Sequence, residues 1–561
     1  MSLPSTPVPP AAHPPPGPGV TDKGLKSGAL GLFASTVIGL ASTAPAYSLA
    51  ATLGVIVGIV GYQSPVVIIL AFIPMFLIAY GYKELNRADP DCGTTFTWAS
   101  RAFGPRTGWL GGWGIVAADI IVMANLAQIA GAYGFQLVGA NGLARDTFWV
   151  TVVGVLWIAV MTLICYVGIE ISANLQKLLL TIEVVVLFLL AITALVKVYG
   201  GTAPSVSSEL SWSWFNPAHI GSLDALTKSV LAGVFIYWGW DTAVSVNEET
   251  VDRDRTPGRA AVTSTVILLL VYLMVTTSAQ AFAGVGDHGI GLANPEHSGD
   301  VLSSLGAEVF GSGGWGTVAT KLLILMVLTS AAASTQTTIL PTARTTLSMA
   351  AFKAIPDRFA RIHPRFLTPT WSTVGMGLAS IAFYVMLTRV SENVLADSIG
   401  SVGLMIAFYY GLTGFACVWY YRRVLTRTPR DLWTKGIMPA LGGVLLLYFF
   451  VNACVVYAAP DYGSTSWTFP FPPHWHLGGV FVTGIGALLL GAVLMLLYRA
   501  IRPTFFRKET IPVSAYERDG PQGDGHERDG HKRDGHERNG HEGDGDKRDG
   551  HKRDRHERNG R

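Results

Sequence analysis

Two acidic residues stand inside long apolar stretches of the sequence, where a carboxylate is unusual. Glu183 is followed by three valines, and Asp119 lies in the run AADIIVMA. An ionised carboxylate in apolar surroundings is costly, so such residues are rare and are often functional. We therefore predict that Glu183, with Asp119 as a second candidate, carries a coupling proton. The alternative is a structural role, in which Glu183 bonds to a neighbouring polar group and Asp119 bonds to Asn125 or Gln128.

A second feature is a break in the first apolar run, between Gly39 and Pro45. Proline lacks an N–H and clashes with the carbonyl four residues earlier, which here belongs to Ala41. Ser42 and Thr43 can bond the backbone groups that such a break frees. An unwound stretch within a membrane would leave N–H and carbonyl groups available to a ligand. A proline kink that serves only helix packing is the alternative.

A matching break is predicted in the sixth run, where the aromatic cluster Phe235–Asp241 surrounds Gly239. Aromatic side chains beside a glycine can wall or gate a bound solute. An aromatic belt at the membrane interface is the alternative, although such a belt is found at the end of a span rather than within it. Paired breaks at equivalent places in two halves are typical of transporters with inverted repeats.

These residues lie in a chain that is built mainly of apolar runs. It has 561 residues, of which 50% are hydrophobic and 14% charged, whereas a soluble domain carries about a quarter charged residues. A helix of about 20 apolar residues crosses a bilayer. Twelve runs qualify, at residues 28–50, 64–82, 107–137, 147–168, 172–197, 224–246, 260–284, 315–348, 372–389, 395–421, 437–458 and 477–499.

The basic residues of the connections predict the orientation. They gather after every second run, at Lys83, Arg87, Arg101, Arg106, Arg253, Arg255, Arg259, Lys353, Arg358, Arg361, Arg365, Arg422, Arg423, Arg427, Arg430 and Lys435. Connections rich in Lys and Arg stay in the cytoplasm. Both termini are therefore predicted to be cytoplasmic, with the chain in the plasma membrane. The basic loops could also touch anionic lipid headgroups.

The two ends of the chain differ from the apolar centre. Residues 1–24 are rich in proline, and residues 506–561 are charged, repetitive and rich in histidine. Neither segment can bury enough apolar surface to fold, so both are predicted to be disordered cytoplasmic segments. Metal chelation by the histidines of the tail is the alternative to a merely solvated tail.

The sequence predicts no cofactor, no metal site, no nucleic-acid partner and no enzymatic activity. It contains no phosphate-binding G-x-x-x-x-G-K-[ST] motif, and its histidines gather in the loops and the tail rather than in the apolar runs. Four cysteines lack any metal-ligand spacing and are interpreted as free thiols: Cys92, Cys165, Cys417 and Cys454. An ion gradient or exchange is therefore expected to drive any transport.

At the two breaks the sequence resembles the amino acid–polyamine–organocation superfamily, in its amino acid permease branch. The segment FIYWGWDTAVSVNEE, from Phe235 to Glu249, resembles the family's signature in the sixth helix. The stretch from Gly39 to Ser42 resembles the family's Gly-Ser-Gly break, with Ala41 in place of the second glycine. The resemblance extends over roughly residues 25–500.

This resemblance implies an all-α polytopic membrane protein with 12 transmembrane helices. Ten of them would form a five-plus-five inverted-repeat core like that of the leucine transporter, and two would be peripheral. It implies secondary active transport of an amino acid by alternating access. Main-chain groups and the gating ring would come from Ile38, Gly39, Ala41, Ser42, Phe235, Tyr237 and Gly239, and Trp238 would wall the side-chain pocket. Trp240 and Asp241 would hold the break in shape.

The driving ion and the substrate stay open at this point. Sodium is the alternative to a proton and would need hydroxyls on the eighth run, which offers Ser330, Ser334, Thr335, Thr337 and Thr338. The acids Asp119, Asp241 and Glu248 would suit a polyamine or another organic cation, taken up or exchanged. If these acids are structural, a neutral amino acid suits the pocket better. Glu248 and Glu249 are expected to pair with Arg253 or Arg255.

Overall fold

The computed structural model describes residues 23–296, 300–311 and 313–510. They belong to one compact unit, Met1–Ser514, and the second unit, Ala515–Arg561, lies outside the described residues. The predicted disordered segments also lie outside them, except for residues 23–24 and 506–510. Their disorder stays a prediction.

The described part of the chain is predominantly helical. The first half contains α1 (Leu32–Ser42), α2 (Pro45–Val60), α3 (Ser64–Ala88), α4 (Thr95–Phe103), α5 (Pro105–Leu137), α6 (Thr147–Val167), α7 (Ile169–Tyr199), α8 (Leu223–Ile236) and α9 (Thr242–Ser245). The second half contains α10 (Thr256–Ala283), α11 (Val301–Phe310), α12 (Gly314–Ala351), α13 (Thr370–Val390), α14 (Glu392–Tyr421), α15 (Pro429–Asp431), α16 (Met438–Ala458), α17 (Gly479–Ile501) and α18 (Pro503–Phe506).

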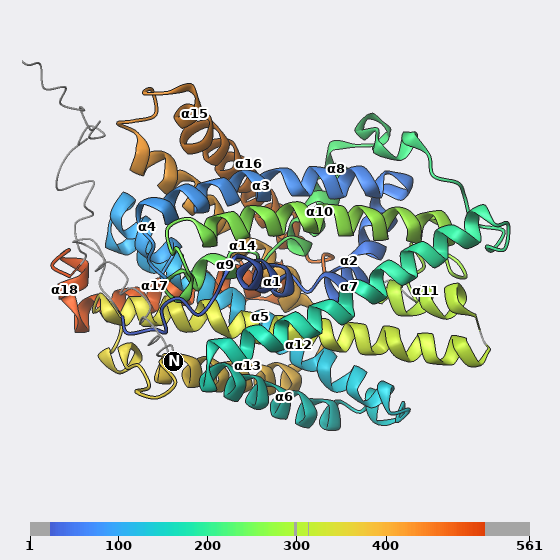
Figure 1. Cartoon of the computed structure of the whole chain (residues 1–561), viewed down its shortest axis with the longest axis horizontal. Helices are drawn as coiled ribbons and strands as arrows, with labels where there is room; N and C mark the ends of the chain where they lie inside the picture. Colours follow the sequence, from blue (N-terminus) through green and yellow to red (C-terminus); the bar gives the residue numbers. More distant parts are fainter. Residues whose placement is uncertain (1–22, 297–299, 312, 511–561) are drawn as a thin grey trace, which may run out of the picture. The chain divides into compact units, whose positions relative to one another are not determined.

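Short elements connect these helices. Turns of 3-10 helix lie at Gly61–Gln63, Leu143–Arg145, Trp212–Phe215, Pro217–His219, Asn247–Glu249 and Asp357–Ala360, and a π-helical turn lies at Leu432–Ile437. Two strands, β1 (Ser466–Thr468) and β2 (His476–Gly478), pair antiparallel between α16 and α17. The long helices run side by side, with α1 and α9 near the middle of the view in Figure 1.

Ten stretches of the described residues are long and apolar enough to cross a membrane. One of them, Leu32–Ala88, is 57 residues long and holds α1, α2 and α3, far more than the roughly 20 residues that one crossing needs. The helix α8, in contrast, has only 14 residues and is too short to be counted alone. Twelve crossings and the inverted repeat therefore remain a proposal.

The first and the sixth predicted runs are each interrupted in the structure, and both interruptions have a local cause. The first predicted run, 28–50, is divided at Pro45, and the helix resumes as α2 and continues to Val60. The sixth, 224–246, is divided after Ile236 and resumes at Thr242. The sequence prediction also lacked α4 and α11, which are amphipathic or short and do not reach the length of a span.

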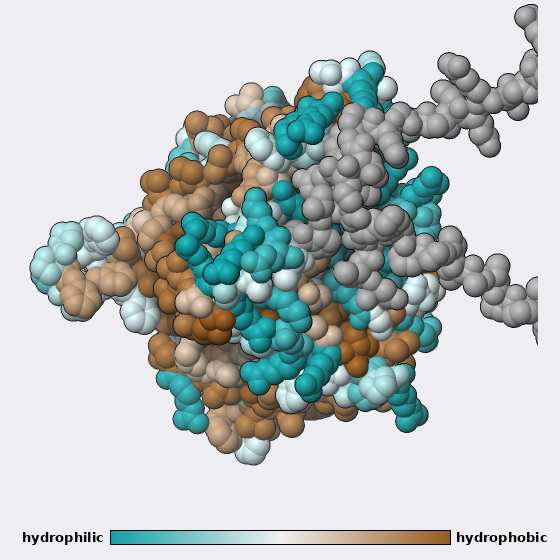
Figure 2. Space-filling model, turned by 90° about the vertical axis from the view of Figure 1, so that its left-hand side faces the viewer, coloured by the Kyte–Doolittle hydropathy of each residue, from teal (hydrophilic) through white to brown (hydrophobic). Residues whose placement is uncertain are grey.

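The outer helices present large apolar side chains on their exposed faces, for example Leu163 of α6, Ile192 of α7 and Val455 of α16. Apolar faces of this kind suit a lipid environment and would be unfavourable in water. Figure 2 looks at the end where α4 and α18 lie, and there hydrophilic residues gather in the middle with hydrophobic residues along the left and lower margins. The four cysteines are free.

Candidate substrate and coupling site

The first predicted break is present, between α1 and α2. Ala44 has a φ of 45°, in the left-handed region, and Pro45 begins the next helix. Proline is favourable at a helix start, because an N–H at that position would have no helical partner and proline therefore loses no hydrogen bond. The Thr43 hydroxyl donates to the Leu40 carbonyl at 2.8 Å, so it satisfies part of the interrupted backbone.

The second predicted break is also present and touches the first. Residues 237–241 form a non-helical segment between α8 and α9, and Gly239 has a φ of 118°. A Cβ atom at Gly239 would lie 2.7 Å from the Ser42 carbonyl oxygen. The Ser42 and Thr242 hydroxyls are 2.9 Å apart and hydrogen-bonded. The two breaks therefore meet at Ser42, and only glycine fits at residue 239.

The remaining predicted residues of the first break are packed inside the protein. Ile38 and Ala41 are fully buried, and Ile38 belongs to a hydrophobic cluster with Met123 and Ile339. Gly39 faces α10, where an added Cβ would lie 2.6 Å from the Ser264 hydroxyl oxygen. Gly39 thus has a close packing contact that the sequence did not suggest.

Two tyrosines of α14 hold the aromatic segment in place, and the sequence prediction missed both. The Trp238 indole N–H donates to the Tyr409 hydroxyl at 2.5 Å. The Tyr410 hydroxyl donates to Asp241 Oδ1 at 2.7 Å, and the Tyr409 hydroxyl donates to Oδ2 at 3.4 Å. Both carboxylate oxygens of Asp241 therefore accept hydrogen bonds from tyrosine hydroxyls. The adjacent pair of tyrosines in an otherwise apolar run was the available signal.

Tyr237 and Phe235 complete the second break. The Tyr237 ring is buried, and its hydroxyl donates to the Ile68 carbonyl at 3.2 Å. Phe235 is half-buried, in the last turn of α8. The Tyr272 hydroxyl donates to the Ile236 carbonyl at 2.6 Å, so one carbonyl that the break frees already has a donor.

Glu183 lies beside the first break. Its Oε1 accepts from the Ala46 N–H at 2.7 Å and from the Ser330 hydroxyl at 2.8 Å, and the residue is fully buried. Ala46 is in the first turn of α2, whose N–H groups lack helical partners and attract negative charge. The other carboxylate oxygen, Oε2, has no hydrogen-bond partner among the described residues. This geometry joins α7, α2 and α12 through one carboxyl group.

Asp119 lies elsewhere in the bundle. The Thr342 hydroxyl of α12 donates to Asp119 Oδ2, so the predicted bond to Asn125 or Gln128 is wrong. Those two amides accept instead from the Tyr47 and Tyr384 hydroxyls. In the fold, Asp119 bonds across to Thr342 rather than within its own helix, because α5 and α12 pack against each other.

The hydroxyls of the eighth run divide into two groups. Ser330 bonds Glu183, and the Ser334 hydroxyl donates to the Ser42 carbonyl at 3.2 Å. Thr335 and Thr337 donate to carbonyls one turn earlier in their own helix, at 2.7 and 3.0 Å. Thr338 is buried as well. Ser330 and Ser334 are thus the two that reach the first break.

The acids that follow the second break have unexpected partners. Glu249 pairs with Arg344 of α12 through two bonds of 2.9 Å, with both side chains fully buried. Glu248 pairs with Lys23, which precedes α1. The predicted pairing with Arg253 or Arg255 is therefore wrong, because the nearest basic residues in the sequence are not the nearest ones in the fold.

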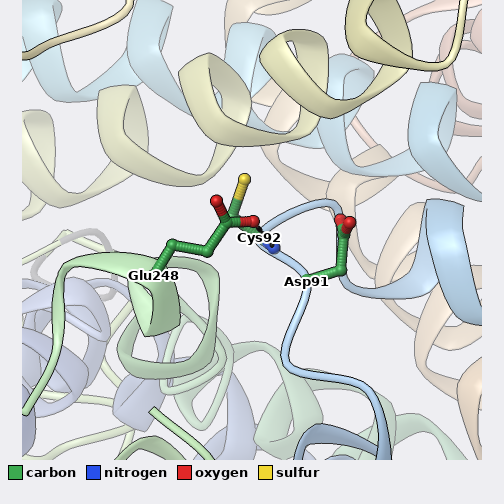
Figure 3. Close-up of side chains that lie close together, drawn as sticks. All are labelled: Asp91, Cys92 and Glu248. Atoms are coloured by element: carbon green, nitrogen blue, oxygen red, sulfur yellow. Dashed lines mark hydrogen bonds between the residues drawn. The ribbon is translucent and has the colours of Figure 1, made fainter. Parts of the chain in front are cut away.

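Lys23 is the centre of a second buried cluster. Figure 3 shows the Glu248 carboxyl group next to Cys92, with the Asp91 side chain to the right of them. One potential ligand atom of each residue lies within 4.8 Å of the others. The Lys23 ammonium bonds both Glu248 and Asp91, the latter at 2.9 Å. A metal ion would therefore have to displace Lys23, and we interpret the cluster as an ion-pair site.

The charges of this cluster stabilise one another. Burial alone would lower the pKa of Lys23, but the negative charges of Asp91 and Glu248 raise that pKa well above its usual value. Burial would raise the pKa of Asp91, yet Lys23 holds it below its usual range. Asp89, which pairs with Arg101 at 2.8 Å, has a pKa raised to about 6 by burial.

A bundle of apolar helices with two touching breaks, and with a buried carboxylate at the start of the helix that follows the first break, is typical of a membrane transporter. The family described as amino acid permease matches residues 29–498, and the chain belongs to this family. It is a multi-pass membrane protein, and several of its relatives are transporters of amino acids or amines.

Three relatives illustrate the range of the family. A branched-chain amino acid permease of Lactococcus lactis subsp. cremoris is 24% identical over 223 residues, which are 37% of this chain and 46% of the relative. A low-affinity putrescine importer of Escherichia coli K12 is 21% identical over 75% of this chain and 88% of the importer. Cationic amino acid transporter 3, mitochondrial, of Arabidopsis thaliana is 23% identical over 61% of this chain and 54% of that protein.

Proposed function

We propose that this protein is a secondary active transporter of amino acids that works by alternating access. It lies in the plasma membrane with both termini in the cytoplasm. Twelve crossings, ten of them in a five-plus-five inverted-repeat core, would position the site where the two broken helices meet. The observation that carries the proposal is the contact between the breaks, where Gly239 leaves room only for the backbone at Ser42.

The substrate binds between these two breaks. The helices α2 and α9 begin here, and α1 and α8 end here. Helix ends at a break leave main-chain groups without helical partners, and such groups can bind the carboxylate and the amine of an amino acid. Ile38, Gly39, Ala41 and Ser42, in the last turns of α1, supply main-chain groups to the substrate carboxylate and amine. Phe235, Tyr237 and Gly239 supply carbonyls and a gating ring. Trp238 walls the side-chain pocket.

A neutral side chain fits this site better than a cationic one. Asp241 is occupied by Tyr409 and Tyr410, Asp119 accepts from Thr342, and Glu248 pairs with Lys23. A cationic substrate would need an acid to pair with it, because a buried unpaired charge is costly. Glu183, whose Oε2 has no hydrogen-bond partner among the described residues, is the acid that we assign to the coupling ion instead. Branched-chain or other neutral amino acids are therefore the proposed substrates.

Glu183 is the proposed proton carrier. As a carboxylate it accepts two hydrogen bonds and lies at the start of α2, where negative charge is favourable. Protonation removes the charge and weakens both bonds, so it loosens the attachment of α2 to α7 and α12. Proton binding and movement of the first broken helix are thereby coupled.

Sodium is the second candidate, and it rests on a specific set of oxygens. Glu183 Oε2, with no hydrogen-bond partner among the described residues, belongs to the same carboxyl group that accepts from Ser330. Ser334 bonds the Ser42 carbonyl. Carboxylate, hydroxyl and carbonyl oxygens are the ligands that hard cations prefer.

The ion pairs at the cytoplasmic end close the site from that side. Lys23 ties the segment before α1 to Asp91 and Glu248, and Leu30 forms backbone hydrogen bonds with Glu249 and Val251. Opening toward the cytoplasm separates α1 from these groups and breaks the Lys23 pairs.

The test is uptake into proteoliposomes that contain the purified full-length protein. Labelled leucine, arginine and putrescine are each supplied with an inward proton gradient, an inward sodium gradient or no gradient. The proposal expects leucine to accumulate with the proton gradient and the other two solutes to remain at background. Accumulation of arginine or putrescine would contradict the neutral substrate, and uptake of no solute under any gradient would contradict the function.

A further inference from the structure

A groove opens on the outer face of the bundle at the end of α14. Its lining comes from the end of α4, the start of α5 and the last three turns of α14, and its volume is about 750 Å³. We call this the Arg422 groove, and its lining residues are Phe103, Thr107, Leu412, Phe415, Val418, Trp419 and Arg422. Most of these side chains are apolar, so the groove suits a hydrocarbon chain.

One end of the groove carries a fixed positive charge. The Arg422 guanidinium lies over the Trp419 ring, with 4.5 Å between the guanidinium carbon and the ring centroid. One of its N–H groups donates to the Trp419 carbonyl at 2.6 Å. Arg422 has no ion pair within the residues that the structure describes. Since guanidinium has five N–H donors, most of them remain available for an anion.

The surroundings of Arg422 are positive and aromatic. Arg423 and Arg106 adjoin lining residues in the sequence and are exposed. The nearest acid along the chain, Asp431, is neutralised by Lys435 at 2.6 Å. The Phe103 and Trp419 rings lie 6.0 Å apart and are partly exposed. Aromatic rings of this kind mark the headgroup level of a membrane.

From these contacts we infer that the Arg422 groove binds a phospholipid with an anionic head group. The lipid phosphate pairs with Arg422 at the headgroup level, and one acyl chain lies along Leu412, Phe415 and Val418. Basic pockets between helices on the cytoplasmic side suit anionic lipids. The lipid is preferred to a second copy of the chain because one lipid molecule supplies both an anion for Arg422 and a hydrocarbon chain for the apolar lining.

This inference depends on membership in the membrane-protein family and not on the transported solute. The full-length protein is purified in detergent, and retained lipid is measured by native mass spectrometry with added phosphatidylglycerol or phosphatidylcholine. Wild type is expected to retain one phosphatidylglycerol per chain, about fivefold more tightly than phosphatidylcholine, the contribution of one basic residue at the surface.

Three variants test the assignment. Arg422→Gln is expected to lose the preference for phosphatidylglycerol, and Val418→Trp, which fills the groove, is expected to lose retention of both lipids. Arg365→Gln is the matched control, because Arg365 is exposed, stacks on Phe366 at 5.6 Å and lies outside the groove. It should behave like wild type.

Equal retention of the two lipids by wild type would overturn the inference. So would an unchanged preference in Arg422→Gln, or a lipid-free dimer that depends on the groove. Should Arg422→Gln aggregate, Arg422→Lys keeps the charge without the planar stack and should keep the preference in weakened form. Loss of the preference in Arg365→Gln would also contradict a specific site.

Discussion

Replacing Gly239 by alanine perturbs the contact on which the proposed site depends. The residue has a φ of 118°, and a non-glycine residue in such a region costs about 1–3 kcal/mol. The new Cβ would lie 2.7 Å from the Ser42 carbonyl oxygen, whereas ordinary contact begins at 3.4 Å. The two breaks must therefore separate by about 0.7 Å (3.4 − 2.7).

The strain falls on the arrangement in which the two breaks meet, which is the proposed binding arrangement. A penalty of 1–3 kcal/mol on that state lowers its population about 5- to 150-fold. We expect the initial rate of leucine uptake into proteoliposomes to fall by about this factor. The melting temperature of the purified variant, measured in parallel, shows how much of the penalty falls on folding instead.

Gly58→Ala is the matched control for Gly239→Ala. Gly58 lies in α2, and an added Cβ there would meet nothing within 4 Å. This variant should transport like wild type. Uptake at the wild-type rate by Gly239→Ala, in protein that is equally well folded, would refute the placement of the site at the contact between the breaks.

Three further perturbations follow from other contacts. Gly39→Ala should reduce uptake about tenfold, because its new Cβ would contact the Ser264 hydroxyl. The double variant Gly39→Ala with Ser264→Ala should recover most of the lost uptake, because the Cβ of residue 264 would then be the nearest atom on α10, at 3.3 Å. Lys23→Gln leaves Asp91 and Glu248 without their cation, so the free energy of unfolding should fall by about 3 kcal/mol. A lower melting temperature would show this loss, and an unchanged melting temperature would contradict the buried pairing. The pKa of Asp89 is about 6, above its usual 3.8, so the folded state binds the proton more tightly than the unfolded state. Stability from this group should rise as pH falls from 7 to 5, by about 1 kcal/mol. Thermal unfolding across that range should show this gain in wild type relative to Asp89→Asn, and parallel curves would contradict it.

The sequence alone predicted the features that have local signatures. Pro45 interrupts a helix wherever it occurs in an interior, and Gly239 within an aromatic cluster indicates a special backbone. Both breaks lie where these residues predicted them. Long apolar runs likewise predicted the helices that surround the breaks, since the length of a span is set by the bilayer.

The sequence alone could not predict the contacts that join distant segments. Glu248 is 225 residues from Lys23, and Asp241 is 169 residues from Tyr410. A basic residue close in sequence, such as Arg253, was preferred for Glu248 because no pattern reveals which side chain folds against it. Arg344, fully buried against Glu249, gave no signal beyond its place in a polar-rich part of α12. Glu183 was predicted from its apolar neighbours, but its partners Ala46 and Ser330 became visible only in the fold.

Proton coupling through Glu183 is tested by proton-driven leucine accumulation in proteoliposomes that contain wild type or Glu183→Gln. Glutamine keeps the size of the side chain but cannot bind or release the proton. Glu170→Gln on the same helix is the matched control, since Glu170 is exposed and pairs with Lys26. We expect Glu183→Gln to lose accumulation against a gradient, whereas Glu170→Gln should accumulate leucine like wild type. Accumulation by Glu183→Gln at the wild-type level would contradict coupling at the first helix break.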